Sequence, residues 1–290
     1  MTLSPPKTVG ILHPGSMGAA VAAQLRRAGV RVLWDPSGRS TATVRRAHRA
    51  GLEESGGLAE LVERCDTVIS LCPPAAAEDI ALQVAGHGPA GRVYVEANAI
   101  APERVRRIAR GLPGTAVVDA AVIGSPPSGG KQPRLYVSGP PDTVGALERL
   151  FADTDVRVHP LGEEIGRASA LKLAYTAYQK TSRVLAAIAY GAAEANGVTD
   201  ELLSLAGQRS ASYLTEPDYI PKTAARAWRW APELREAAAL VAAAGLPDDV
   251  LHATAAVLTR WEDARDTDLS LEEALDLLRD RNDPTVTPPR

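Results

Sequence analysis

Cysteine is nearly absent from this chain of 290 residues, which contains only Cys65 and Cys72. Two cysteines cannot build the disulfide framework of a small secreted protein, so we expect a reducing, cytoplasmic location. Neither the cysteines nor the five histidines stand in a ligand spacing such as HExxH, so we expect no metal site. The first eight residues are polar and contain proline, a pattern that predicts no secretory leader.

A surplus of positive charge and long apolar runs are lacking as well. The chain has 32 Lys and Arg against 35 Asp and Glu, so we expect no nucleic-acid partner. The one short basic run, Arg45 to Arg49, is typical of a solvated helix face. No stretch reaches the roughly 18 apolar residues of a membrane span. With 45% hydrophobic and 23% charged residues, the composition is that of a globular protein.

The first part of the chain alternates short strand patterns with helical patterns. Between the first two predicted strands lies a predicted helix, Met17–Ala28. Such alternation predicts parallel βαβ crossovers with helices on both faces of a sheet. The predicted strands are Thr8–Leu12, Val30–Trp34, Thr67–Leu71, Val93–Glu96, Ala116–Asp119 and Leu135–Ser138.

The pattern changes near Gly162–Gly166, after which only helices are predicted. They are Ala168–Asn196, Asp200–Ala211, Thr223–Ala244, Asp248–Asp263 and Leu271–Arg281. The sequence therefore predicts an α/β fold with two domains. A Rossmann domain with a doubly wound, mostly parallel sheet spans residues 1–163, and an all-helical domain spans residues 164–290.

The first strand runs into the first helix through a glycine-containing turn, Gly10 to Gly18. In a dinucleotide-binding turn, one glycine lets the backbone approach the pyrophosphate, and a later one lets helix and strand pack closely. Gly15 and Gly18 suit these two roles, although His13 replaces the first glycine of a GxGxxG pattern. The helix N-terminus adds free N–H groups. Cofactor contacts are predicted for His13, Pro14, Gly15, Ser16 and Met17.

The end of the second strand is where an adenosine ribose should lie. An acidic side chain there binds the ribose 2′-hydroxyl of NAD, whereas arginine with hydroxyl groups binds the 2′-phosphate of NADP. Asp35 supports NAD, but the loop carries an extra residue that moves Asp35 away from the ribose. We therefore favour NADP(H) over NAD(H), with contacts from Ser37, Arg39 and Ser40.

Later strand ends should meet the same crevice, because ligands bind at the carboxyl ends of parallel strands. Cys72 and Pro73 follow one strand and are predicted to line the cofactor site. Asn98 follows the next and is expected to contact the nicotinamide or the substrate. Substrate contacts are predicted for Ile123, Gly124 and Ser125, which follow the strand after that.

These motifs resemble the 3-hydroxyacid dehydrogenases related to 6-phosphogluconate dehydrogenase, a superfamily that includes the imine reductases. The resemblance rests on the glycine turn, on Glu96–Pro102 and on Gly166–Lys172, and it covers nearly the whole chain. His13–Gly18 together with Ala168–Lys172 looks like a subgroup with a C-terminal helical domain of unknown function. Residues 230–233 and 245–247 also resemble that domain.

The resemblance implies that Lys172 is the general acid/base, because a cationic donor is needed near the developing oxyanion. At helical spacing Lys172 shares a face with Tyr175, Thr176 and Gln179, which could orient substrate or relay a proton. Tyr175 is therefore a further catalytic candidate, and Thr176 and Gln179 are substrate-contact candidates. The resemblance also implies a homodimer built through the long helix Ala168–Asn196.

The chain departs from the superfamily where a substrate carboxylate is usually held. Tyr175 and Thr176 replace two asparagines, Ile123–Ser125 replaces Ser-Gly-Gly, and Pro232–Glu233 replaces a Lys-Asp pair. A less acidic carbonyl, alcohol or imine is thus at least as plausible a substrate as a small hydroxy acid. An imine reductase, with Tyr175 or Tyr178 sharing proton donation, and a non-catalytic NADP(H) sensor are the alternative functions.

Overall fold

The computed structural model describes residues 8–195, 197–208, 216–243 and 248–279. Two compact units make up the chain, Met1–Lys172 and Leu173–Arg290. This division falls inside a long helix, whereas the predicted domain boundary at residues 163 and 164 lies in the loop before it. Because that helix is continuous, we keep the loop as our proposed functional boundary.

The first unit contains one sheet, which in the described part of the chain has eight strands. Its order is β3-β2-β1-β4-β5-β6-β7-β8, and every neighbouring pair is parallel except β6 with β7. The strands are β1 (Thr8–Ile11), β2 (Arg31–Trp34), β3 (Glu53–Glu54), β4 (Thr67–Ser70), β5 (Val93–Glu96), β6 (Ala116–Ile123), β7 (Arg134–Ser138) and β8 (Arg157–Pro160).

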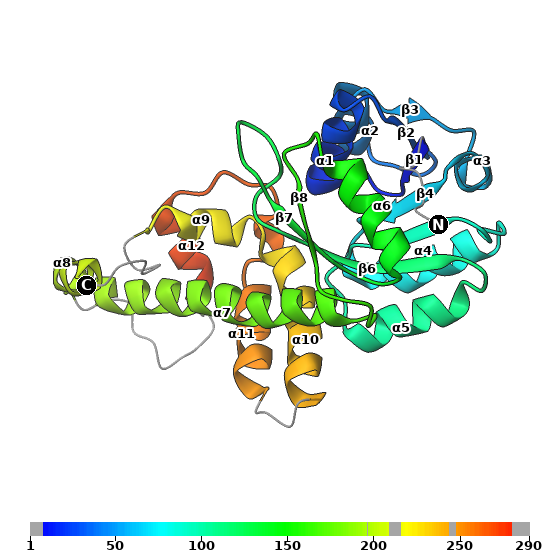
Figure 1. Ribbon diagram of the computed structural model, residues 1–290. Helices are drawn as coiled ribbons and strands as arrows, with labels where there is room; N and C mark the ends of the chain where they lie inside the picture. Colours follow the sequence, from blue (N-terminus) through cyan, green and yellow to red (C-terminus); the bar gives the residue numbers. More distant parts are fainter. Residues whose placement is uncertain (1–7, 196, 209–215, 244–247, 280–290) are drawn as a thin grey trace. The chain divides into compact units, whose positions relative to one another are not determined.

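Helices cover both faces of this sheet (Figure 1). One apolar core joins the sheet to α1 (Ser16–Arg27), α2 (Thr41–Arg49) and α6 (Pro141–Phe151). The other core joins it to α3 (Leu58–Arg64), α4 (Ala77–Ala85) and α5 (Pro102–Gly111). Successive residues of the parallel strands enter opposite cores, which makes these strands apolar on both faces. The order β3-β2-β1-β4-β5-β6 confirms the doubly wound Rossmann prediction.

Three strand predictions need correction. β6 runs four residues beyond its predicted end, because Ala120–Ile123 continues to pair with the antiparallel strand β7. The two strands β3 and β8 were not predicted. Both are short edge strands with charged or polar residues, so neither shows the apolar run that marks a buried strand.

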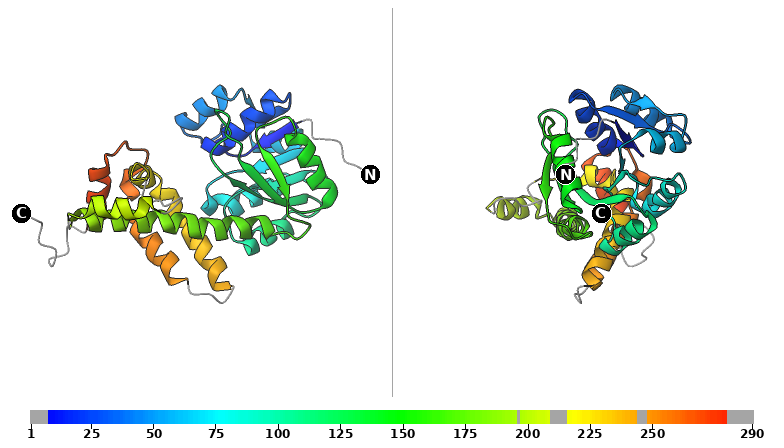
Figure 2. Two further views of the ribbon diagram at one scale, coloured as in Figure 1. Left: turned by 60° about the vertical axis from the view of Figure 1, so that its left-hand side comes forward. Right: turned by 45° about the vertical axis from the view of Figure 1, so that its right-hand side comes forward.

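The second unit is helical in its described residues, as the left-hand view of Figure 2 also shows. The predicted helix Thr223–Ala244 is wrong as a single element, because one helix ends at Ala224 and the next begins at Ala227. The helices are α7 (Arg167–Ala195, shared with the first unit), α8 (Thr199–Gly207), α9 (Tyr219–Ala224), α10 (Ala227–Ala243), α11 (Asp249–Thr259) and α12 (Leu271–Leu278). Predicted helix ends at 196, 209–211, 244 and 280–281, and the family-like residues 245–247, lie outside the described residues.

Tryptophan side chains form part of the helical core. Trp261 is fully buried and its indole N–H donates to the carbonyl of Ala274 at 2.7 Å. Trp230 is also buried, and this agrees with a packing role for both side chains. None of the described helices is long and apolar enough to cross a membrane.

Candidate cofactor-binding and active site

The glycine-containing turn places an uncapped helix N-terminus at the carboxyl end of β1. Gly15 is the residue before α1 and has no side chain to cap it. Its carbonyl accepts the first helical hydrogen bond, from the N–H of Ala19 at 2.9 Å. The N–H groups of residues 16–18 precede that bond and therefore have no partner within the helix. Such a terminus favours an anionic group.

Gly18 is required by the close packing of this turn. A Cβ atom at Gly18 would lie 2.5 Å from the backbone oxygen of His13, a distance that backbone atoms cannot absorb. The turn is therefore tight and its backbone is open toward the helix terminus. These are the properties that a dinucleotide pyrophosphate needs, so the residues present fit an NAD(P) cofactor.

Arg39 reaches the same turn from the end of β2. Its guanidinium donates to the carbonyl oxygen of Leu12 at 2.9 Å and lies 3.3 Å from His13 Nδ1. Burial, followed by the positive charges of Arg39 and Arg46, lowers the pKa of His13 from 6.5 to about 4. His13 is therefore neutral at neutral pH and can accept a hydrogen bond from Arg39. The structure thus brings Arg39 and His13 together.

Arg46 is a residue that the sequence analysis missed, because it was assigned to a solvated basic face. The structure corrects this interpretation: Arg46 donates to Thr43 Oγ1 at 3.1 Å and approaches the carbonyl of Pro14 at 3.5 Å. Thr43 and Arg46 are three residues apart on α2, and this helical spacing was the available signal. Two guanidinium groups therefore contact the backbone of residues 12–14.

Two other side chains of this loop accept hydrogen bonds from backbone N–H groups. Asp35 is buried, and its carboxylate accepts from the N–H of Ser37 at 2.9 Å. Ser40 caps α2, where its hydroxyl accepts from the N–H of Thr43. Ser37 itself is exposed.

Asn98 lies in a buried polar cluster at the carboxyl ends of β4 and β5. Its amide nitrogen donates to Ser70 Oγ at 3.0 Å and to Glu96 Oε1, and it lies 3.3 Å from Cys72 Sγ. Asn98 Oδ1 is buried and has no hydrogen-bond partner among the described residues. An unpaired amide oxygen is costly in the interior, so a donor on a bound cofactor or substrate would stabilise it. Pro73, beside this cluster, is exposed.

Glu96 is fully buried in the same cluster. Burial is the main cause that raises its pKa from 4.5 to about 8, and the charge of Asp119 raises it further. The N–H of Asn98 donates to Glu96 Oε1 at 3.0 Å, and this bond acts in the opposite direction. Glu96 is therefore mainly protonated at neutral pH.

Lys172 lies in the second turn of α7 and is partly buried. Its ammonium nitrogen donates to the carbonyl oxygen of Val122 at 3.0 Å, near the end of β6. The predicted substrate residues follow directly: Ile123 ends β6, and Gly124 and Ser125 are exposed in the next turn. Lys172 and these residues are therefore brought to the carboxyl edge of the sheet.

Tyr175, Thr176 and Gln179 follow Lys172 along α7 and belong to the second unit. Gln179 donates its amide to the hydroxyl of Tyr175 at 3.2 Å. The sequence analysis missed the next residue of α7, Lys180, which forms a buried ion pair with Glu233 of α10. Glu233 belongs to the Pro232–Glu233 pair singled out in the sequence analysis, and its cationic partner lies on α7.

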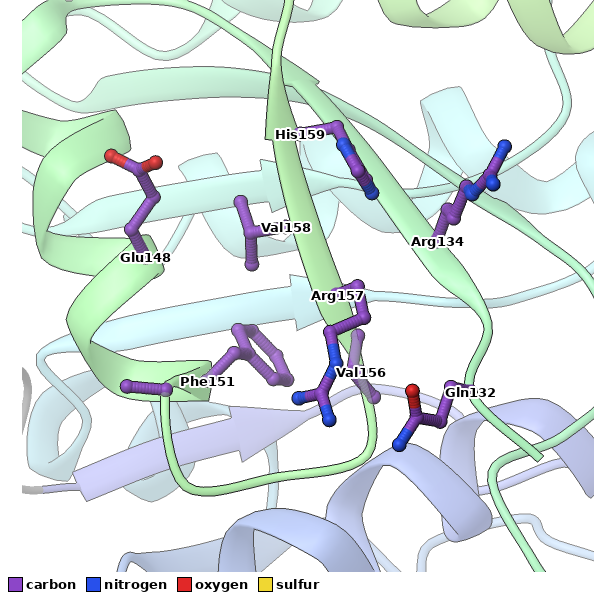
Figure 3. A pocket seen from close by; sticks show the side chains of 9 residues that line it. Gln132, Arg134, Glu148, Phe151, Val156, Arg157, Val158 and His159 are labelled. Carbon is purple, nitrogen blue, oxygen red and sulfur yellow. The ribbon is translucent and has the colours of Figure 1, made fainter. Parts of the chain in front are cut away.

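A groove of about 540 Å³ lies elsewhere, beside the edge strand β8 (Figure 3). The side chains that line it come from the segment around the start of β7, from α6 and from β8, and they include Arg134, Phe151 and His159. None of the residues predicted for the cofactor or substrate lines this groove. It is therefore separate from the candidate site.

Comparison with known proteins agrees with this geometry. The family described as the NAD binding domain of 6-phosphogluconate dehydrogenase matches residues 8–161, which is more than half of the chain. The chain belongs to this family. A domain of unknown function matches residues 193–261, within the helical part. This 6-phosphogluconate dehydrogenase-like protein thus has an NAD(P)-binding domain of the dehydrogenase type.

Solved structures with the same fold cover nearly all of the chain. A conserved protein of unknown function, described as structurally similar to 3-hydroxyacid dehydrogenases, is 26% identical (TM-score 0.66, covering 89% of this chain and 97% of that one). The 3-hydroxyisobutyrate dehydrogenase of Mycobacterium tuberculosis with L-serine is 20% identical (TM-score 0.71, 94% and 99%). A reductive aminase of Aspergillus terreus with NADPH and ethyl levulinate is 18% identical (TM-score 0.59, 95% and 100%).

The raised pKa of Glu96 predicts a pH-dependent stability. Between the ordinary value of 4.5 and about 8, the folded state keeps a proton that the unfolded state releases, so stability falls as the pH rises through this window. Glu96→Gln removes this titration. We expect the variant to gain about 3 to 4 kcal/mol in unfolding free energy over the wild type between about pH 5 and about pH 8.

Urea unfolding of the cofactor-free protein across this pH range measures the difference. Glu63→Gln is the matched control, because Glu63 is exposed on α3. A constant difference between Glu96→Gln and the wild type at all pH values would show that Glu96 does not hold a proton in the folded state.

Proposed function

We propose that this protein is an NADP(H)-dependent oxidoreductase that acts on a hydroxyl/carbonyl pair, with Lys172 as general acid/base. The observation that carries the proposal is the placement of the Lys172 ammonium, 3.0 Å from the carbonyl oxygen of Val122. Lys172 is thereby held at the carboxyl end of β6, the sheet edge at which the glycine-containing turn and Asn98 also lie. Ligands of doubly wound sheets bind at this edge.

Each group would have a distinct task. The bound cofactor supplies or accepts the hydride. Lys172 donates a proton to the carbonyl oxygen in reduction and removes it in oxidation. Asn98 offers its amide oxygen to the nicotinamide or the substrate. Tyr175 is a proposed partner in proton transfer, since Gln179 donates to its hydroxyl.

The substrate that we propose is a carbonyl or alcohol less acidic than a small hydroxy acid. At the positions of the family's carboxylate-binding residues the chain has Ile123 and an exposed Gly124 and Ser125. Two of these offer only a backbone or a hydroxyl group, and Ile123 offers an apolar surface. Ile123, Gly124 and Ser125, with Thr176 and Gln179, are our proposed substrate contacts.

The first prediction from this proposal concerns the choice of cofactor. Arg39 lies beside His13 and the turn, so Arg39→Ala should weaken NADPH binding about 10- to 100-fold and change NADH binding little. Fluorescence titration with each cofactor measures both affinities. Arg45→Ala is the matched control, because Arg45 is an exposed residue of α2.

Equal weakening of NADPH and NADH binding would assign Arg39 to the loop structure and not to the 2′-phosphate. Tighter binding of NADH than of NADPH by the wild type would overturn the NADP preference.

The second prediction concerns Lys172. Lys172→Ala should lower kcat about 10²- to 10⁴-fold, the usual contribution of a general acid or base, and leave the affinity for NADPH unchanged. Turnover is followed by NADPH absorbance with a panel of ketones, aldehydes, 3-oxo acids and cyclic imines. Lys131→Ala is the control, since Lys131 is an exposed lysine of the same unit.

Other outcomes separate the alternative functions. Imine reduction that survives Lys172→Ala but is lost in Tyr175→Phe would favour an imine reductase. A wild type that binds NADPH tightly and reduces nothing in the panel would favour a non-catalytic sensor.

We further propose a homodimer that forms through α7. Tyr178 on this helix is 73% exposed, which is unusual for a large aromatic side chain. Sedimentation should give a mass of about twice the 30.5 kDa of one chain. Tyr178→Asp should weaken this dimer, whereas Leu82→Asp, at an exposed position of α4, should not. A stable, active monomer would overturn the proposal.

A further inference from the structure

The first turn of α7 is capped by a side chain from the middle of the sheet. Asp119 of β6 accepts hydrogen bonds at Oδ2 from the N–H groups of Gly166 and Ser169, both at 3.0 Å. Its Oδ1 accepts from the hydroxyl of Ser169 at 2.6 Å. We call this arrangement the Asp119 cap. Asp119 and Ser169 are both fully buried, so water does not compete for these bonds.

The residue before α7 cannot cap the helix with its own side chain. Gly166 precedes the helix at φ +109°, a conformation that L side chains rarely adopt. A Cβ at Gly166 would also lie 2.9 Å from Cβ of Pro102, so no residue with a capping side chain fits there. The N–H groups at the helix start have no partner within the helix and therefore need an acceptor from another element, and a carboxylate is favoured at a helix N-terminus.

The cap and Lys172 bind the same strand. Ser169 is bonded to Asp119, and Lys172, three residues later, is bonded to Val122, three residues later on β6. The bonded partners are thus 50 residues apart in both cases. The start of α7 is fixed to β6 at two points, and the second of them is the ammonium group of Lys172.

We propose that Asp119 is a positioning residue for Lys172: the Asp119 cap fixes the first turn of α7 on β6 and so sets where the Lys172 ammonium is held. The inference rests on the proposed role of Lys172 in proton transfer. Loss of the cap lets the first turn shift, and the ammonium then leaves the carbonyl of Val122. Small displacements of a reacting group are costly, because proton transfer needs a defined donor position.

The test combines three variants of the full-length protein. Asp119→Asn removes the charge and replaces one acceptor by a donor, and Ser169→Ala removes only the hydroxyl donor of the cap. Ser138→Ala is the matched control: Ser138 is buried and donates to the same Asp119 Oδ2 at 3.3 Å, but it belongs to β7 and not to α7. Ser169→Ala keeps the test available if Asp119→Asn does not fold.

The first measurement needs no substrate. Amine labelling of the cofactor-free protein, read by peptide mass spectrometry, gives the reactivity of Lys172 relative to the exposed Lys131. We expect this ratio to rise about threefold or more in Asp119→Asn and Ser169→Ala, as expected when a charged hydrogen bond is lost, and to stay unchanged in Ser138→Ala.

The second measurement is turnover. In Asp119→Asn and Ser169→Ala kcat should fall about tenfold or more, while the affinity for NADPH stays at the wild-type value. A merely structural role would instead weaken cofactor binding and unfold the protein, without a selective change at Lys172.

The outcomes are distinct. An unchanged labelling ratio in folded Asp119→Asn and Ser169→Ala overturns the inference. So does an unchanged kcat in those variants when Lys172→Ala abolishes turnover. If Lys172→Ala keeps full turnover, the proposed function fails, and the catalytic part of the inference fails with it. The labelling ratio then still reports whether Asp119 sets the environment of Lys172.

Discussion

The buried carboxylate of Asp119 is the contact on which the arrangement of the active-site edge depends. It stands on β6, one strand beyond β5, and it accepts from β7 and from the start of α7. Burying a carboxylate that has no hydrogen-bond donors is strongly unfavourable for the folded state. Burial accordingly raises the pKa of Asp119. Its donors to both oxygens offset that cost. The start of α7 is consequently held at a fixed position on β6.

A second buried acid, Glu96, is mainly protonated at neutral pH. Its neighbours at the strand ends are a phenol, a thiol, a hydroxyl and an amide, none of which carries a positive charge. Burial keeps the group mainly protonated, although Tyr94 and Asn98 donate to it. The polar cluster beneath the sheet edge is thus close to neutral. A neutral cluster orients Asn98 without adding a charge that would oppose a bound anionic cofactor.

The parts that could be predicted from the sequence are those with local causes. β5 was predicted with its observed bounds, Val93–Glu96, because a buried parallel strand must be apolar on both faces. The glycine turn was predicted because Gly15 and Gly18 answer local steric demands. Lys172 was found only through the family resemblance, since on a helix its residue type alone indicates an exposed side chain.

The parts that could not be predicted depend on contacts between distant segments. The cap links Asp119 with Ser169, and nothing near either residue indicates the other. Arg46 was read as solvated because its contact, Pro14, lies on another element. β8 has no apolar run, and it is defined by its pairing with β7. The break after Ala224 carries no proline or glycine, so helix propensity continued through it.

The ion pair of Lys180 with Glu233 bears on the nature of the substrate. Both side chains are largely buried, and the ammonium of Lys180 also lies 5.2 Å from the ring centre of Trp230. The guanidinium of Arg183 lies 5.6 Å from the same ring. A buried ammonium beside a carboxylate has much of its charge compensated, so it attracts a substrate carboxylate less than a solitary lysine would. This lysine and this acid are therefore engaged with each other and with Trp230 inside the helical unit. This is a further reason to expect a substrate recognised by its carbonyl and its apolar surface rather than by an acidic group.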